Sequence, residues 1–218
     1  MIDYRAARVS MVESQLRTNK VTDEALLAAF LAVPRERFVP RHLAGIAYVD
    51  EDLPLGHGRF LTEPMVLARL LQLAAIQPTD RVLDIGAATG YAAALLSRLA
   101  LSVVAVEAEP ALIETARAQL AALGCANVAL VKAPLAAGHP AGAPYDVILI
   151  DGAVAVIDEA VARQLAPGGR LVTVLKGEGA VGQAVVMTEA GGVLSHWPVF
   201  DAATPVLPPF QAAPSFVF

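Results

Sequence analysis

The chain has little cysteine, little charge and few aromatic residues. Its 218 residues include a single cysteine, 17% charged residues and 6% aromatic residues. Cys125 alone cannot form an intrachain disulfide or a cysteine-rich metal site, which suits a reducing compartment. The net charge of −5 leaves no basic excess of the kind that nucleic-acid binding requires. The 56% share of hydrophobic residues excludes a disordered chain.

Long hydrophobic runs are also missing, although the mean hydropathy is +0.56. A membrane-spanning helix needs about 18 uninterrupted apolar residues. The apolar stretch 99–106 is shorter, and the uncharged segment after Asp201 is broken by Pro205, Pro208, Pro209 and Pro214. The first residues lack the apolar core of a secretion signal. We therefore expect a cytoplasmic protein with no membrane or nucleic-acid partner. The histidines lack metal-ligand spacing, so we assign no metal site.

The order of the elements predicts an α/β fold. Residues 1 to about 45 show helical spacing of apolar residues, and Pro34 ends a helix that begins near Asp23. Farther along, apolar strands alternate with helices, which favours right-handed crossovers and a parallel sheet. The predicted strands are 81–85, 103–107, 128–132, 145–150 and 170–175, and the predicted helices are 63–75, 91–99, 110–123 and 157–165.

Two further apolar segments, 183–188 and 192–200, are typical of a hairpin at the sheet edge. We therefore expect a single domain with a doubly wound, mostly parallel sheet of about seven strands. Residues 1–60 would form a helical extension with a loop, residues 61–176 a Rossmann-like core, and residues 177–218 the edge hairpin and tail.

The strongest site signal is the glycine turn after the strand 81–85. Residues 84–90 read Asp-Ile-Gly-Ala-Ala-Thr-Gly, and doubly wound sheets bind ligands at this end of their strands. The dinucleotide pattern G-x-G-x-x-G fails at Ala88 and Tyr91, which argues against a nicotinamide-dependent oxidoreductase. The methyltransferase pattern, acidic-x-G-x-G-x-G, fails only at Ala88. The Asp84 carboxylate would repel a pyrophosphate but attract the ammonium group of S-adenosylmethionine.

A second acidic residue follows the next strand. Glu107 stands about twenty residues farther on, where a carboxylate can accept hydrogen bonds from both hydroxyls of a ribose. Asp84 and Glu107 could each be an ordinary polar residue at a strand end. Together with the glycine turn between them, they favour S-adenosylmethionine as the ligand.

Beyond this turn, the sequence resembles the protein-L-isoaspartate O-methyltransferase family of protein repair enzymes. The resemblance covers about residues 10 to 207 and rests most on two blocks, Val33-Pro34-Arg35-Glu36-Arg37-Phe38-Val39-Pro40 and Leu53-Pro54-Leu55-Gly56-His57-Gly58. Further matches are Met11-Val12, Gln15-Leu16, Ala47-Tyr48, Thr62-Glu63-Pro64, Asn127-Val128, Pro144-Tyr145-Asp146 and 164–172.

The resemblance implies that a monomeric enzyme transfers a methyl group from S-adenosylmethionine to the α-carboxyl group of an L-isoaspartyl residue in a damaged protein. A carboxylate is already a nucleophile at neutral pH, so the enzyme mainly orients the reactants and excludes water. Thr62 stands where the family has its functional serine, which makes it the predicted catalytic residue. The predicted cofactor-binding residues are Asp84, Ile85, Gly86, Ala87, Ala88, Gly90, Glu107, Ala108, Ala133 and Pro134.

The acceptor side departs from the family. The family reads Gln-Thr-Ile-Ser-Gln-Pro where this chain reads Arg59-Phe60-Leu61-Thr62-Glu63-Pro64, Ala133-Pro134-Leu135 replaces Gly-Asp-Gly, and Asp151-Gly152-Ala153 replaces Thr-Ala-Ala. The substrate-side residues would thus be Arg59, Phe60, Leu61, Glu63 and Asp151. Phe60 adds bulk, and Glu63 would repel an anionic acceptor unless Arg59 offsets it.

Each of these residues also has a purely structural interpretation. Thr62 and Asp151 could cap the helices that follow them, and Arg59 could be a solvated loop residue. The segment 35–37 is most simply a surface ion-pair cluster, although the resemblance suggests that it orders the N-terminal helices. Two alternative functions remain, which are a methyltransferase of the same family with a different acceptor and a protein that binds S-adenosylmethionine without transferring the methyl group.

Overall fold

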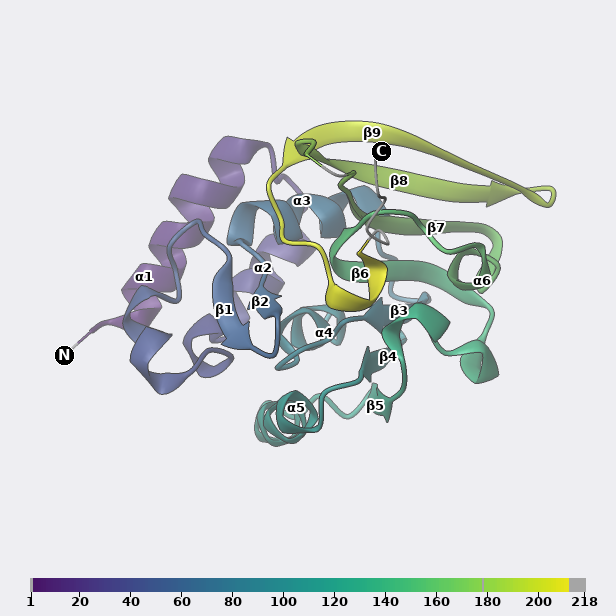
Figure 1. Ribbon diagram of the computed structural model, residues 1–218. Helices are drawn as coiled ribbons and strands as arrows, with labels where there is room; N and C mark the ends of the chain where they lie inside the picture. The colour runs from purple at the N-terminus through teal and green to yellow at the C-terminus, as the bar shows by residue number, and fades with distance from the viewer. Residues whose placement is uncertain (1, 178, 212–218) are drawn as a thin grey trace, which may run out of the picture.

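The computed structural model describes residues 2–177 and 179–211 and contains one large twisted sheet flanked by helices (Figure 1). Pro214 and the end of the expected tail lie outside these residues. The sheet has seven strands in the order β5-β4-β3-β6-β7-β8-β9. Their bounds are β3 Arg81–Ile85, β4 Ser102–Glu107, β5 Val128–Lys132, β6 Tyr145–Val154, β7 Leu165–Leu175, β8 Gly182–Ala190 and β9 Val193–Ala202.

The pairing of the strands confirms the doubly wound, mostly parallel class. Strands β3 to β7 run parallel to one another, whereas β8 is antiparallel to both β7 and β9. From β3 the chain first winds outward to β4 and β5, and then returns to place β6 on the other side of β3. The chain thus reverses direction beside β3, and the crevice at such a reversal is where this fold binds ligands.

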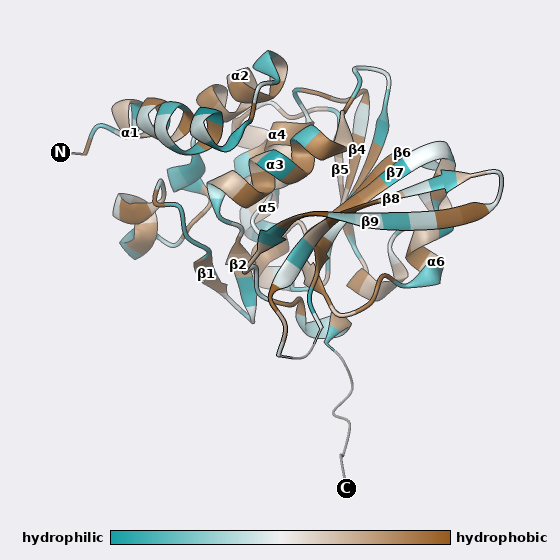
Figure 2. Ribbon diagram, turned by 90° about the horizontal axis from the view of Figure 1, so that it is seen from above, coloured by the Kyte–Doolittle hydropathy of each residue, from teal (hydrophilic) through white to brown (hydrophobic). Residues whose placement is uncertain are grey.

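Helices cover both faces of the sheet. Their bounds are α1 Tyr4–Met11, α2 Glu24–Ala32, α3 Pro64–Ala74, α4 Tyr91–Leu96, α5 Pro110–Ala122 and α6 Glu159–Ala162. A π-helix, Val12–Leu16, continues α1. Seen from above, the central strands are mostly hydrophobic, and α1 alternates hydrophobic and hydrophilic residues (Figure 2). This is the pattern of buried strands and of a helix with one face in solvent.

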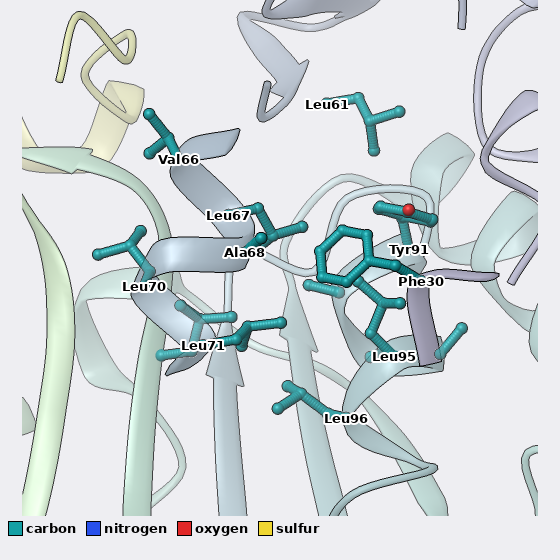
Figure 3. Close-up of a cluster of buried hydrophobic side chains, with 14 of the residues drawn as sticks. Phe30, Leu61, Val66, Leu67, Ala68, Leu70, Leu71, Tyr91, Leu95 and Leu96 are labelled. Carbon is teal, nitrogen blue, oxygen red and sulfur yellow. The ribbon is translucent and has the colours of Figure 1, made fainter. Parts of the chain in front are cut away.

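The larger core lies where α2, α3 and α4 meet (Figure 3). Phe30 of α2 and Tyr91 of α4 pack edge to face, with ring centroids 6.2 Å apart. Leu67 of α3 and Leu95 of α4 are fully buried beside them. The N-terminal helices therefore share one core with the helices of the sheet.

Two local predictions were wrong. The loop expected near the end of residues 1–60 instead forms a two-stranded hairpin, with β1 Leu53–Gly56 and β2 Arg59–Leu61. The helix expected over 157–165 ends at Ala162, and β7 begins at Leu165 instead of residue 170. Pro167 restrains the residue before it to extended conformations, which favours a strand there.

Arg35 is the main correction outside the site. Instead of lying in a surface cluster, its side chain is 0% exposed. Its Nε donates to the carbonyl oxygen of Ala47 at 2.7 Å and its Nη2 to that of Thr62 at 2.9 Å. The guanidinium carbon lies 5.1 Å from the centroid of the Tyr91 ring. Arg35 therefore fixes the backbone that leads into α3.

We predict that Arg35→Met lowers the free energy of unfolding by about 2–4 kcal/mol, because two buried carbonyl groups lose their donors. Urea denaturation measures the change. Arg37→Met is the matched control, since Arg37 is exposed and its loss should change stability by no more than about 0.5 kcal/mol. Equal losses in the two variants would contradict the role given to Arg35.

Candidate functional site

In the turn between β3 and α4, three residues have a left-handed backbone conformation. Gly86, Ala88 and Gly90 have φ of 90°, 46° and 94°. Ala88 occupies the place of the missing glycine and keeps the conformation that a glycine would adopt there, despite its Cβ. In this conformation the N–H of Ala88 donates to Oε2 of Glu107 at 2.9 Å. The departure at Ala88 therefore leaves the shape of the turn intact.

Glu107 lies at the end of β4 and is 1% exposed. Its Oε1 accepts hydrogen bonds from the N–H groups of Ala108 and Glu109, at 2.8 and 3.1 Å. Together with the bond from Ala88, these contacts fix the carboxylate at the edge of the sheet. An acceptor held in this way is suited to binding the hydroxyls of a sugar.

Asp84 lies one strand away, in β3, and is 0% exposed. Neither of its carboxylate oxygens has a hydrogen-bond partner within the protein. Burial and the neighbouring Asp151 carboxylate raise the pKa of Asp84 well above its usual value. A buried carboxyl group with two free acceptors fits a ligand that carries a cationic hydrogen-bond donor, such as an ammonium group.

An apolar cavity of about 490 Å³ lies beside Glu107. It is lined by Ala108, Lys132, Ala133, Pro134, Leu135, Ala136 and Pro209. The structure thus brings the predicted cofactor residues of three successive strand ends together. Ile85 and Ala87 are buried in the wall behind the turn.

Thr62 and Asp151 form a buried pair on the other side of the turn. The Thr62 hydroxyl donates to Oδ1 of Asp151 at 2.8 Å, and the two residues are 2% and 6% exposed. The capping roles considered for both were wrong, because the Thr62 side chain makes no cap and Asp151 lies inside β6. Asp52 and Asp50 instead accept hydrogen bonds from the N–H groups of Glu63 and Met65, at the start of α3.

Burial raises the pKa of Asp151 to about 6. The hydrogen bond from Thr62 and the charges of Arg59 and Arg35 act in the opposite direction. Asp151 therefore lies among the cations and carboxylates of this site, directly after Ile150, the last residue of β6 that pairs with β3.

The other predicted substrate-side residues lie on the hairpin or just after it. Phe60 is half-buried and, by strand alternation, faces away from Arg59 and Leu61. Leu61 is 3% exposed and belongs to the core with Leu67. Burial and the acidic residues Asp52, Asp50 and Glu51 raise the pKa of Glu63 to about 7. Glu63 therefore belongs to an acidic group at the start of α3.

Arg59 is the residue whose expected surroundings differ most from those observed. It is 4% exposed, so the interpretation as a solvated loop residue was wrong. Its Nη2 donates to the carbonyl oxygen of Gly86 at 2.6 Å, and its Nη1 lies 3.3 Å from Oε2 of Glu107. The guanidinium thus lies inside the predicted cofactor site.

The segment after β9 also contributes to the site, which the sequence analysis did not foresee. It descends in front of β6 in Figure 1, drawn in yellow. The N–H of Leu207 donates to the carbonyl oxygen of Ala153 at 2.8 Å, and a Cβ at Gly152 would lie 2.6 Å from the Leu207 side chain. Gly152 therefore allows this segment to approach. In the sequence, prolines are the one distinctive feature of this segment, and they do not predict a contact with β6.

Two further features are absent from the described ranges. No group of three or more His, Cys, Asp or Glu side chains in residues 2–177 and 179–211 could hold a metal ion. None of the helices in these residues has the length and apolar character that a membrane span requires.

Comparison with known proteins gives a consistent result. A model of the "Protein-L-isoaspartate(D-aspartate) O-methyltransferase (PCMT)" family matches residues 7–191. A protein-L-isoaspartate O-methyltransferase of Methylorubrum extorquens is 48% identical over 170 residues, which are 78% of this chain and 74% of the relative. That of Aromatoleum aromaticum is 41% identical over 197 residues, which are 90% of this chain and 88% of the relative.

Solved structures with the same overall fold carry related names. A protein-L-isoaspartate O-methyltransferase aligns with a TM-score of 0.79 and 26% identity, over 92% of this chain and 65% of that chain. A Plasmodium falciparum structure proposed to be such an enzyme, in complex with S-adenosyl-L-homocysteine, aligns with a TM-score of 0.78 and 18% identity. The second alignment covers 92% of this chain and 97% of that chain.

The raised pKa of Asp151 gives a prediction about stability. The folded protein binds this proton more tightly than the unfolded chain does, so ionisation of Asp151 lowers stability as the pH rises from about 4 through 6. Asp151→Asn removes this loss. We expect the variant to exceed the wild type in unfolding free energy by about 1–3 kcal/mol at pH 7.5, and by little at pH 4.

Denaturant titrations at the two pH values measure this difference. Asp201→Asn, at an exposed position of β9, is the control and should show no such pH-dependent gain. A gain from Asp151→Asn that is equal at both pH values would point to packing instead of charge.

Proposed function

Because the chain belongs to the protein-L-isoaspartate(D-aspartate) O-methyltransferase family, we propose that it methylates the α-carboxyl group of L-isoaspartyl residues in damaged proteins, with S-adenosylmethionine as the methyl donor. The structural observation that carries this proposal is the buried Asp84, whose two oxygens lack partners beside the glycine turn. They supply the acceptors that the ammonium group of this cofactor requires.

Each part of the cofactor has a counterpart in the site. S-adenosylmethionine supplies an electrophilic methyl group on its sulfonium. Asp84 binds the ammonium group, Glu107 accepts hydrogen bonds from the ribose hydroxyls, and the apolar cavity beside Glu107 takes the adenine. The residues that we propose for cofactor binding are Asp84, Ile85, Gly86, Ala87, Ala88, Gly90, Glu107, Ala108, Ala133 and Pro134.

The acceptor lies on the side of Thr62 and Asp151. A substrate carboxylate needs no base, because it is ionised at neutral pH. The chain therefore has to orient this carboxylate and exclude water from it. We assign the orienting hydrogen bond to the Thr62 hydroxyl. Arg35 holds the backbone of Thr62 in place, and the single hydroxyl proton, donated to Asp151 in this structure, would turn to the substrate carboxylate. The substrate-side residues in this proposal are Arg59, Phe60, Leu61, Glu63 and Asp151.

We also propose that residues 1–218 act as one domain, as a monomer and in the cytoplasm, on protein or peptide substrates. The single cysteine supports a reducing compartment, and the net charge of −5 supports a partner other than nucleic acid.

The central prediction is methyl transfer to an isoaspartyl peptide. Incubation with methyl-labelled S-adenosylmethionine should label the isoaspartyl peptide and leave the aspartyl peptide of the same sequence unlabelled. Absence of label on both peptides, in a sample that binds the cofactor, would contradict isoaspartyl methylation and direct the search to other acceptors.

Asp84→Asn should weaken binding of S-adenosylmethionine by about 1–3 kcal/mol, because a charged hydrogen bond to the ammonium group is lost. Isothermal titration calorimetry measures this change. Asp146→Asn removes a carboxylate at the other end of the sheet, which accepts a hydrogen bond from the N–H of Arg81, and should leave the affinity unchanged. Equal affinity in wild type and Asp84→Asn would refute the placement of the ammonium group.

A further inference from the structure

Arg59 contacts two hydrogen-bond acceptors in the part of the site that we assign to the cofactor. Its guanidinium donates to the carbonyl oxygen of Gly86 and contacts the carboxylate of Glu107. The carbonyl oxygen lies in the turn that the proposed function assigns to the cofactor, and the carboxylate is assigned to its ribose. A Cβ at Gly86 would lie only 2.8 Å from Nη2 of Arg59. Arg59 and the bound cofactor therefore compete for the same part of the pocket.

The charges of the pocket explain why a cation is held there. Asp84, Glu107 and Asp151 are all nearly or wholly buried, and Arg59 favours the ionised forms of both aspartates. Carboxylates buried close together are unfavourable without a nearby positive charge. Arg59 supplies that charge in the structure described here. Once the cofactor is bound, its own ammonium and sulfonium groups would supply it.

The guanidinium of Arg59 is incompletely hydrogen-bonded, so its side chain can move out of the cofactor pocket. Its Nε is buried without a hydrogen-bond partner, and Nη1 has only the ion pair with Glu107. Arg59 belongs to β2 of the small hairpin, next to the exposed turn 56–58. The long side chain can therefore turn away from Glu107 without a rearrangement of the main sheet.

The acceptor side offers such a displaced guanidinium a role. An isoaspartyl substrate presents a carboxylate, and Asp151 places a further acidic group at the same edge of the sheet. Two carboxylates in one buried cleft repel each other unless a cation lies between them or beside them. A guanidinium is well suited to this task because it can bind a carboxylate through two parallel hydrogen bonds.

We propose that Arg59 is an exchangeable cation, which fills the cofactor pocket of the free enzyme and, when displaced by S-adenosylmethionine, binds the carboxylate that is to be methylated. The proposal rests on the proposed function. It makes Arg59 a residue that positions the acceptor, and it makes acceptor binding depend on prior cofactor binding.

The test compares the binding of S-adenosylmethionine and S-adenosylhomocysteine by calorimetry, in wild type, Arg59→Gln and Arg59→Lys. The two ligands differ by the methyl group and the positive charge that it places on sulfur. A displaced guanidinium that binds the acceptor carboxylate stays close to the sulfur, because this carboxylate has to reach the methyl group. Removing its charge should therefore favour the cationic ligand, and Arg59→Gln should raise the preference for S-adenosylmethionine by about tenfold. Arg59→Lys keeps the charge and should keep the wild-type preference.

Both ligands should also bind Arg59→Gln at least as tightly as wild type, because the internal competitor is gone. The KM for an isoaspartyl peptide should rise about tenfold in this variant, with a smaller change in kcat, because the carboxylate loses its cation. Arg69→Gln is the matched control. Arg69 lies on α3 over the ring of Phe200, outside the site, and its loss should change neither quantity.

The outcomes separate the two proposals. A wild-type protein that binds neither ligand would overturn the proposed function. Binding with an unchanged preference in Arg59→Gln, or weaker binding of both ligands, would overturn the role of Arg59 in the pocket. A wild-type KM in that variant would overturn the acceptor contact. Circular dichroism checks folding, and Arg59→Met serves as a second neutral variant if Arg59→Gln does not fold.

Discussion

Carboxylates buried together at one edge of the sheet are the constraint around which the rest of the site is arranged. Asp84, Asp151 and Glu107 lie at or near the carboxyl ends of β3, β6 and β4, which are neighbours in the sheet. Backbone N–H groups hold Glu107 and a hydroxyl holds Asp151, but Asp84 has no partner. These buried carboxylates are unfavourable without a nearby positive charge, which either Arg59 or the proposed cofactor can supply.

Elements outside the main sheet provide the positive charges and the hydroxyl group of the candidate site. The hairpin β1–β2 provides Arg59, and the chain continues from it into Thr62 and α3. Arg35 holds the backbone of Thr62 from behind, while its guanidinium stacks on Tyr91 of α4. The extension before the sheet is therefore part of the site's architecture as well as part of the hydrophobic core.

The sheet and the place of the glycine turn in it were predictable because each rests on local patterns. Apolar strands alternating with helices specify the doubly wound sheet, and the turn 84–90 with Glu107 marks the strand ends at which we propose that the cofactor binds. Arg59 and Arg35 were misjudged because charged residues are usually solvated, and their burial depends on partners 27 residues or 12 residues away in the chain. The spacing of apolar residues, from which helices and strands are predicted, carries no information on such contacts.

The segment that follows β9 covers one side of the proposed pocket. It pairs with β6 beside Gly152, with the carbonyl oxygens of Pro205 and Phe210 accepting from Ala153 and Ala155. Residues 205–210 come after every strand of the sheet in the order of the chain. The seven strands can therefore pair before this segment docks, and the segment then covers one side of the proposed pocket on a sheet that has already formed.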